Sequence, residues 1–200
     1  MSEAYLTEDY KGYQIEIHQD IDPENPREWE NLFTVVGWSR RYNLTDPDFQ
    51  KQINFSDPEE FLEWWKLQGG GVIHNLFMFD HGALAFSISS FGDPWDSGQV
   101  GFMFATNAKI REWFNVKKIT KAIREKVEEN LKAEIKTLNA WNRGDYCGYV
   151  VEGLDMGSCW GFETSEDAIA AAKEEIDGEI EMIEGKRREA TMEMQAALAM

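Results

Sequence analysis

Three apolar segments follow one another closely in the middle of the chain. They span residues 72–79, 83–89 and 99–106. The first two are joined by Asp80-His81-Gly82, which has the composition of a tight turn. Connections this short join antiparallel strands, because a parallel crossover needs a dozen or more residues. The pattern therefore predicts an antiparallel sheet in this part of the chain.

Helices are predicted before and after these strands. Ser56-Asp57-Pro58-Glu59 is typical of a helix start, so a short helix is expected over 60–67. A helix over 108–114 and a longer one over 117–142 are expected next, since apolar residues of the latter recur every three or four positions. Thr164-Ser165-Glu166-Asp167 predicts the start of a final helix. The apolar stripe of that helix consists of Ile169, Ala172, Ile176, Ile180 and Ile183.

Four more segments have strand patterns. They are 10–17 and 32–38 near one end of the chain and 146–152 and 158–163 near the other. We expect the first two to pair antiparallel and the last two to form a hairpin. The order ββα-βββ-αα-ββα predicts an α+β fold, mainly antiparallel sheet packed by helices, with a long C-terminal helix.

The chain length suits one domain with a helical extension. We expect one α+β domain over residues 1–164 and a helix over 165–200, whose distal part projects or forms a homodimer with a second copy. Segments 9–16 and 145–152 both match D-Y-x-G-Y-x-[IV]-E. Either a ββα unit is duplicated over 9–67 and 145–178, or both segments converge on the same strand-opening turn.

Charge is distributed unevenly. The chain has 37 acidic and 20 basic residues, a net charge of -17. Residues 1–108 hold 18 acids and 6 bases, residues 144–200 hold 14 and 4, and residues 109–143 hold 5 and 10. Two acidic lobes are thus expected to flank a basic helical segment, whose cations at 117–126 contact those lobes or a second copy. Such a charge repels nucleic acid and anionic membranes and attracts a protein with a basic, nucleic-acid-binding channel.

Composition limits the class of protein. Hydrophobic residues make up 42% of the chain and aromatic residues 13%, which excludes intrinsic disorder. No apolar run approaches the length of a membrane span, and the acidic N-terminus has no signal-peptide core. With only two cysteines, Cys147 and Cys159, we expect a cytoplasmic, reduced protein. These two thiols are either a redox pair on one hairpin or two buried or half-buried side chains.

The sequence has no complete catalytic motif. It lacks G-x-S-x-G, H-E-x-x-H, an EF-hand loop and a phosphate-binding loop, so no cofactor is expected. A metal site is an alternative, formed by His18, Asp20, Asp80 and His81. Otherwise the histidines are solvated turn residues. A small enzyme acting on a nucleotide or nucleic acid would use as acid–base or metal groups His18, Asp20, His81, Asp93 and Asp96.

The loop over 91–98 contains Trp95 and two carboxylates. One interpretation is a binding loop, in which contacts to a ligand or partner come from Trp95, Asp96, Ser97 and Gln99. The other is a structural hairpin loop, in which Asp93 and Asp96 accept backbone hydrogen bonds and Trp95 covers a sheet edge. Trp64 and Trp65 raise a related question, since adjacent helical residues cannot both face one core. One of them is expected at an interface or over a neighbouring loop.

Three segments resemble a family of small acidic proteins encoded by bacteriophages and mobile elements. The pattern Y-x-I-E-I-H-Q-D…N-P-R-E-W-E-N-L…R-R-Y-N-L lies between Tyr13 and Leu44. W-D-S-G-Q-V-G-F spans Trp95–Phe102, and S-C-W-G-F spans Ser158–Phe162. The resemblance covers the chain from about Tyr10 to the final helix. It implies no catalytic residue, but it implies a setting in which proteins disable host defence.

These observations predict an anti-CRISPR or antirestriction inhibitor that is not an enzyme and mimics nucleic acid with carboxylates. The acidic candidates for partner binding are Asp20, Asp22, Glu24, Glu28 and Glu30, and on the final helix Glu174, Glu175, Asp177, Glu179, Glu181 and Glu184. Trp64, Trp95 and Asp96 are candidate anchors. The alternatives are a solvated acidic face, the small enzyme described above, and an oligomeric scaffold protein.

Overall fold

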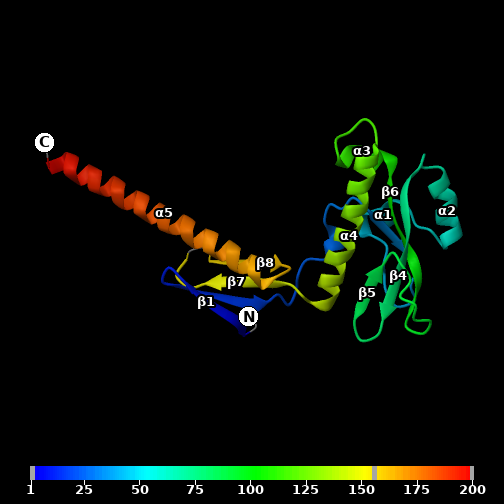
Figure 1. Ribbon diagram of the computed structural model, residues 1–200, viewed down its shortest axis with the longest axis horizontal. Coiled ribbons are helices and arrows are strands. Elements are labelled where there is room, and N and C mark those ends of the chain that lie inside the picture. Colours follow the sequence, from blue (N-terminus) through cyan, green and yellow to red (C-terminus); the bar gives the residue numbers. More distant parts are fainter. Residues whose placement is uncertain (1–2, 155–156, 199–200) are drawn as a thin grey trace. The chain divides into compact units, whose positions relative to one another are not determined.

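The computed structural model describes residues 3–154 and 157–198. The chain divides into two compact units (Figure 1). The terminal unit combines both ends of the chain, Met1–Pro23 and Gly144–Met200. The central unit is Glu24–Arg143. The sequence predicts one domain over 1–164, whereas these contacts set the boundaries at Pro23 and Gly144.

The terminal unit is one sheet covered by one helix. Its strands are antiparallel throughout, in the order β1-β2-β7-β8. The elements are β1 (Ala4–Tyr10), β2 (Tyr13–Gln19), β7 (Cys147–Val151), β8 (Ser158–Phe162) and α5 (Ser165–Leu198). β1 and β2 are joined by Lys11 and Gly12, both at positive φ (50° and 88°). This two-residue turn matches the twist of a hairpin, and glycine reaches such a φ without a steric penalty.

The core of the terminal unit lies between the sheet and α5. The sheet contributes Ile15, Ile17 and Val151, and the helix contributes its predicted apolar stripe from Ile169 to Ile180. Ala172 and Ile176 of that stripe are fully buried, and Ile169 and Ile180 pack beside them. Thr164 caps the helix, because its Oγ1 accepts the backbone N–H of Asp167 at 3.1 Å. The predicted start and inner face of α5 are thus confirmed.

The distal part of α5 has a different environment. All residues from Lys186 to Gln195 are exposed, and the helix continues beyond the edge of the sheet (Figure 1). Met192 and Met194 are each 62% exposed. An unsupported helix of this length is only marginally stable in water. The homodimer expected through this segment stays a prediction.

The central unit has an antiparallel sheet in the order β3-β6-β4-β5, with helices on both faces. Its strands are β3 (Thr34–Gly37), β4 (Gly71–Asp80), β5 (Leu84–Ser87) and β6 (Ser97–Thr106). Its helices are a 3-10 turn η1 (Pro26–Glu28), α1 (Pro47–Gln52), α2 (Pro58–Lys66), α3 (Asn107–Trp113) and α4 (Lys121–Arg143). Asp57 caps α2 by accepting the backbone N–H of Glu60 at 2.9 Å, as its sequence predicts.

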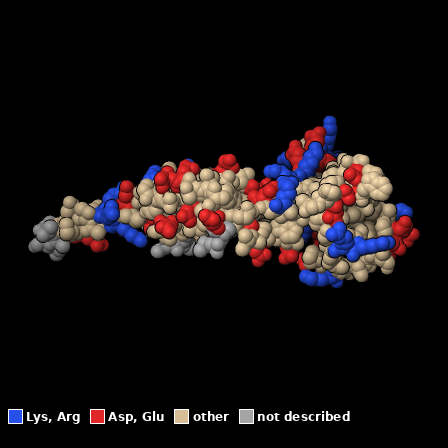
Figure 2. Space-filling model, turned by 90° about the horizontal axis from the view of Figure 1, so that it is seen from below, with Lys and Arg blue, Asp and Glu red and all other residues tan. Residues whose placement is uncertain are grey.

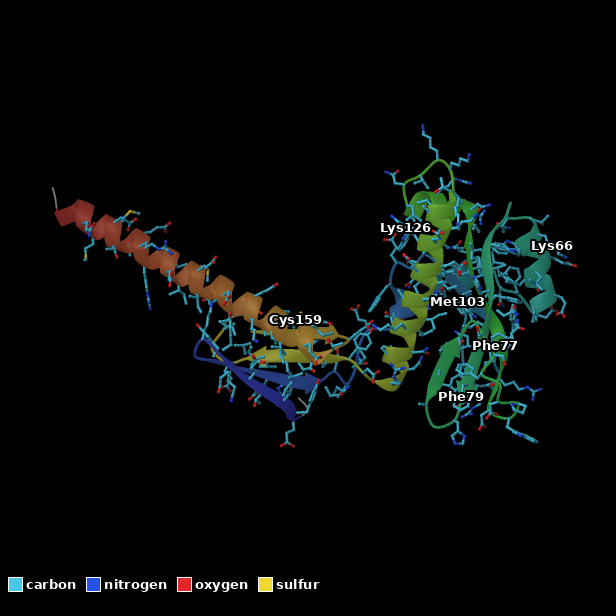
Figure 3. The ribbon with its side chains drawn as sticks, viewed as in Figure 1. Lys66, Phe77, Phe79, Met103, Lys126 and Cys159 are labelled. Carbon is cyan, nitrogen blue, oxygen red and sulfur yellow. The ribbon has the colours of Figure 1, made fainter. Side chains whose placement is uncertain are left out.

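The alternation of side chains along β6 produces two cores. Met103 (labelled in Figure 3) and Ala105 face α4, where they meet Val127 and Leu131. Phe102 and Phe104 face the opposite side, where Phe61 of α2 is fully buried. Both faces of this sheet are therefore covered by helices.

The predicted α+β class, the antiparallel sheets and the long C-terminal helix are confirmed. Two strand predictions are wrong. The segment 10–17 is not one strand, because Lys11 and Gly12 form the turn between β1 and β2. The segment 32–38 does not pair with 10–17: β3 pairs with β6, while β2 pairs with β1 and β7. The two strands of the suggested unit 9–67 therefore lie in different sheets. The repeated sequence also differs in structure, because the first copy surrounds the β1–β2 turn and the second enters β7.

Candidate partner-binding surfaces

The two compact units differ sharply in charge. The terminal unit contains 20 acidic and 5 basic residues, a net charge of -15. The central unit contains 17 and 15, a net charge of -2. The expected arrangement of two acidic lobes is therefore replaced by one acidic unit, because the first strands pair with the last ones. Figure 2 shows Asp and Glu side chains over much of this unit.

Helix α5 has the densest run of carboxylates. Between Ser165 and Glu184 it holds eight acidic residues and a single lysine, Lys173. Twenty helical residues span about 30 Å, which gives one carboxylate per about 3.8 Å of axis. One strand of DNA carries a phosphate per about 3.4 Å of axis. The linear charge density of α5 is thus close to that of a nucleic-acid strand.

The predicted contact residues on α5 differ in exposure and pairing. Glu179 is half-buried, and Glu184 is paired with Arg188 at 3.3 Å. Glu174 and Glu181 are exposed and lie on the side of the helix away from the apolar stripe. Glu175 accepts a hydrogen bond from the hydroxyl of Tyr149. Asp177 is bound by the ammonium of Lys11 at 2.8 Å, and this hydrogen bond lowers the pKa of Asp177. Glu175 and Asp177 therefore help to hold helix and sheet together, whereas Glu174 and Glu181 are available to a partner.

The other predicted acidic run does not belong to one unit. Asp20 and Asp22 are in the terminal unit, while Glu24, Glu28 and Glu30 are in the central unit. Some of these carboxylates are also engaged locally. Asp20 accepts the backbone N–H of Asp22 at 3.2 Å, and Glu24 accepts from the indole of Trp29 at 3.3 Å. These five candidates therefore do not belong to one compact unit.

Trp95 occupies an exposed loop between β5 and β6 that is held by its own hydrogen bonds. Its side chain is 91% exposed, so the prediction that it covers a sheet edge is wrong. Asp93 holds the loop by accepting the backbone N–H groups of Trp95 (2.7 Å) and Asp96 (2.9 Å). These hydrogen bonds lower the pKa of Asp93. Ser97 donates to the carbonyl of Asp93 at 2.5 Å. A large aromatic side chain on a preorganised loop is typical of an interface anchor.

The histidines do not form the suggested metal site. His81 and Asp96 are joined, with Nδ1 2.9 Å from Oδ2, and Asp80 accepts from Arg41 at 2.6 Å. His18 belongs to the terminal unit, where it lies in β2 with only 6% exposure, 3.2 Å from a carboxylate oxygen of Glu16. Within residues 3–154 and 157–198, no three His, Cys, Asp or Glu side chains meet in a way that fits a metal ion.

The histidine environments also differ from the expectation of solvated turns. His81 is an exposed turn residue, as predicted. His18 and His74 lie in strands instead, and His74 Nε2 is 3.2 Å from Glu128 Oε1. The candidate acid–base set is likewise divided between the two units. His18 and Asp20 are in the terminal unit, whereas His81, Asp93 and Asp96 are in the central unit.

Trp64 is a poorer anchor than its sequence suggests. It is half-buried, with ring centroids of Phe49 and Phe55 at 5.6 and 5.5 Å. Trp65 is also half-buried and packs on Phe104 at 5.5 Å. Both tryptophans contact the aromatic core because α2 lies flat across the sheet. Contacts with this core therefore account for the burial of both tryptophans, and neither requires an interface with a partner.

The two cysteines of the β7–β8 hairpin do not face each other. Cys147 is buried and Cys159 (labelled in Figure 3) is exposed; both are free, and they oppose Phe162 and Tyr149 rather than each other. A redox pair is thus not formed.

The basic residues before and within α4, including Lys126 in Figure 3, are exposed. In the part of the chain that the structure describes, no helix is long and apolar enough to cross a bilayer.

Comparisons of the chain with protein-family models, with curated proteins and with solved structures find no match.

Self-repulsion within the terminal unit leads to a prediction on stability. The distance beyond which charges no longer repel strongly is about 30 Å at 0.01 M salt and shortens to about 10 Å at 0.1 M. We therefore expect the melting temperature, followed by circular dichroism, to rise between these two NaCl concentrations. The rise should be smaller in the variant E174Q/E179Q/E181Q, which has three fewer negative charges on α5. A melting temperature that is constant or falls with salt would contradict this account of the acidic unit.

Proposed function

We propose that this protein is a phage-type anti-defence protein that inhibits a host nucleic-acid-targeting nuclease complex, as an anti-CRISPR or antirestriction factor. The terminal unit would occupy the basic channel of its target in place of nucleic acid. The observation that supports this most is the concentration of charge, with -15 of the net -17 in one compact unit. The resemblance to proteins of bacteriophages and mobile elements supplies the biological setting.

The physical basis is competition for cations. A nuclease channel lined by Lys and Arg gains much of its affinity for DNA by neutralising phosphates and releasing their counterions. A folded unit with a similar linear charge density engages the same side chains. The carboxylates of Glu174 and Glu181 are exposed and unbonded within the described residues, so they require little rearrangement to do so. Direct binding of DNA to the terminal unit is not expected, since both carry negative charge.

Trp95 would give the complex a contact that does not depend on charge. It lies in the central unit, 91% exposed, on the loop held by Asp93. Interfaces commonly combine such an aromatic anchor with surrounding charged residues that orient the partner. The inhibitor would thus use α5 to compete for the channel and Trp95 to prolong the complex.

Neutralising three carboxylates of α5 should weaken the complex strongly. The variant E174Q/E179Q/E181Q removes the exposed charges of Glu174 and Glu181 and the half-buried charge of Glu179. At about 0.5–1 kcal/mol per charge, we expect a loss of about 10- to 100-fold in affinity. The test is capture of host proteins at low salt with the tagged chain, followed by mass spectrometry. A nucleic-acid-binding nuclease should be recovered with the wild-type chain and depleted with the variant.

A matched control is available on the other unit. Glu59, Glu63 and Glu129 are exposed and make no ion pair within the described residues. The variant E59Q/E63Q/E129Q changes the net charge by the same amount but leaves α5 intact, so capture should be retained. Equal depletion of the nuclease with both variants would mean that only the net charge of the protein matters. Undiminished capture of the nuclease with both variants would mean that α5 is not part of the interface.

A further inference from the structure

The central unit contains a cleft of about 750 Å³ with an unusual lining for such an acidic chain. It lies between the loop that follows β3 and the segment around α1. Arg40 and Arg41 are on its wall, and among the described residues that line it there is no Asp or Glu. The volume is within the range of small-ligand sites, about 300–1,000 Å³. The residues that line the cleft therefore carry a net positive charge, whereas the protein as a whole is strongly negative.

The loop that presents the two arginines is held in place by its own hydrogen bonds. The hydroxyl of Ser39 accepts the backbone N–H groups of Arg41 and Tyr42 at 3.2 and 3.3 Å. At the base of the loop, the backbone N–H of Trp38 donates to Val100 at 2.7 Å. Thr45 Oγ1 accepts the backbone N–H of Gly37 at 3.1 Å. The cleft wall is thus preorganised, which lowers the entropic cost of binding.

Arg40 and Arg41 have unused hydrogen-bonding capacity. Arg40 is exposed and makes no hydrogen bond or ion pair with any residue that the structure describes. Arg41 donates one hydrogen bond, from Nη1 to Asp80 at 2.6 Å, and its side chain is 72% exposed. This single bond orients the guanidinium while leaving its other N–H groups to solvent. The planar fork of an arginine matches the oxygens of a phosphate group.

The opposite part of the cleft is aromatic and amide-lined. Trp38 and Phe55 belong to the aromatic core, and the indole of Trp38 donates to the carbonyl of Phe55 at 3.2 Å. Gln50 and Asn54 lie beside them. The side-chain amide of Asn54 makes no hydrogen bond within the described residues. Gln50 accepts a hydrogen bond from Asn43 at 3.2 Å, so the free amide is that of Asn54. An aromatic wall next to a free amide suits a planar ring with polar edges, such as a nucleobase.

Two other clefts of the central unit do not share this chemistry. One is lined by Arg27, Lys51 and Lys109 but also by four carboxylates, those of Glu28, Glu30, Asp46 and Asp48. The other is lined mainly by apolar side chains, including Leu76, Leu84 and Phe86. Of these three clefts, only the one with Arg40 combines an unpaired arginine, and no lining carboxylate, with an aromatic wall.

We propose that this cleft binds a free nucleoside phosphate, with the phosphate on Arg40 and Arg41 and the base against Trp38 and Phe55. The proposal does not rest on the inhibitor function. It concerns a cleft of the central unit rather than α5, and its ligand is an anion, whereas the partner proposed for α5 is basic. It assigns the central unit a small-molecule site in addition to its loop with Trp95.

The test is titration of the full chain with AMP and ADP, followed by isothermal calorimetry. We expect saturable binding, and binding about tenfold or more weaker for adenosine and for inorganic phosphate alone, since each lacks half of the contacts. R40Q should lose about tenfold or more in affinity, because a charge-assisted contact to phosphate is removed. Its melting temperature should not change, as Arg40 has no partner in the described part of the chain.

The control variant is R124Q. Arg124 is an exposed arginine on α4 of the same unit, outside the cleft, so its removal should leave nucleotide affinity unchanged. Absence of saturable binding, or equal affinities of the wild-type chain and R40Q, would overturn the proposal. Equal losses in R40Q and R124Q would also overturn it, as they would show non-specific attraction. Tighter binding of a 5′-phosphorylated single-stranded oligonucleotide than of AMP would overturn the assignment to a free nucleotide.

Discussion

Replacing Arg27 by Met should destabilise the central unit by about 3–5 kcal/mol, because it leaves two buried carboxylates without a cation. Arg27 binds Asp46 through two hydrogen bonds, from Nε at 2.9 Å and from Nη2 at 2.7 Å. Its Nη1 binds Glu134 at 3.0 Å. The side chains of all three residues are at most 13% exposed. This network joins the segment before β3, the start of α1 and the middle of α4.

The carboxylates of this network also bind the backbone. Glu134 accepts the N–H groups of Leu32 and Phe33 at 2.9 and 3.1 Å, and Asp46 accepts that of Val35 at 2.9 Å. Burial lowers the pKa of Arg27, but the hydrogen bonds and charges of Asp46 and Glu134 outweigh burial and raise that pKa overall. The guanidinium therefore stays charged at any pH at which the protein folds.

The measurement is urea unfolding followed by tryptophan fluorescence, which reports mainly on the central unit because seven of the eight tryptophans lie there. R27K keeps the charge but loses the bidentate geometry, so an intermediate loss is expected. R27M/E134Q should recover part of the stability lost in R27M, since it removes one uncompensated charge. A loss below about 1 kcal/mol in R27M would contradict a cooperative role of the network.

Truncating Phe61 to Ala should cost about 3–5 kcal/mol, as expected for a large side chain in a well-packed core. Phe61 of α2 is fully buried, with the rings of Phe102 and Phe104 at 5.2 and 5.3 Å. It also contacts Phe55 and Trp64, at 5.5 and 5.8 Å. Its removal leaves a cavity between α2 and the sheet that the rigid aromatic neighbours cannot fill.

The same unfolding measurement checks this prediction. Leu67, at the C-terminal end of α2, is 83% exposed and provides the control: L67A should change stability by less than about 0.5 kcal/mol. If F61A lost as little stability as L67A, Phe61 would not anchor α2 to the sheet. The wall of the cleft with Trp38 and Phe55 would then be held by other contacts.

Most elements could be predicted because their signals are local, although β1 and α1 were not among them. Asp57 and Pro58 mark the start of α2, and Thr164 marks that of α5; each acts within one helical turn. The strand partners of β2 could not be predicted in this way. β2 pairs with β7, more than 120 residues away, and such a pairing is selected by the packing of the whole sheet rather than by the strand alone.

This pairing also explains which parts of the candidate site could be predicted. The excess of acids can be counted in the sequence, but their concentration in one unit depends on the β2–β7 contact. Trp95 could be singled out because Gly, Pro and Asp surround it, and its exposure follows from the loop that Asp93 holds. The Arg27 network could not be predicted, since its three members are far apart in sequence and resemble ordinary surface charges.

The central claim is that the carboxylates of the terminal unit take the place of phosphates in a basic channel. The most direct test is the salt dependence of the complex with the captured nuclease, measured by biolayer interferometry for the wild-type chain and E174Q/E179Q/E181Q. We predict that wild-type affinity falls steeply as NaCl rises from about 0.05 to about 0.2 M, and that the slope is shallower for the variant. An affinity that does not change with salt, or equal slopes for the two proteins, would contradict charge mimicry by α5.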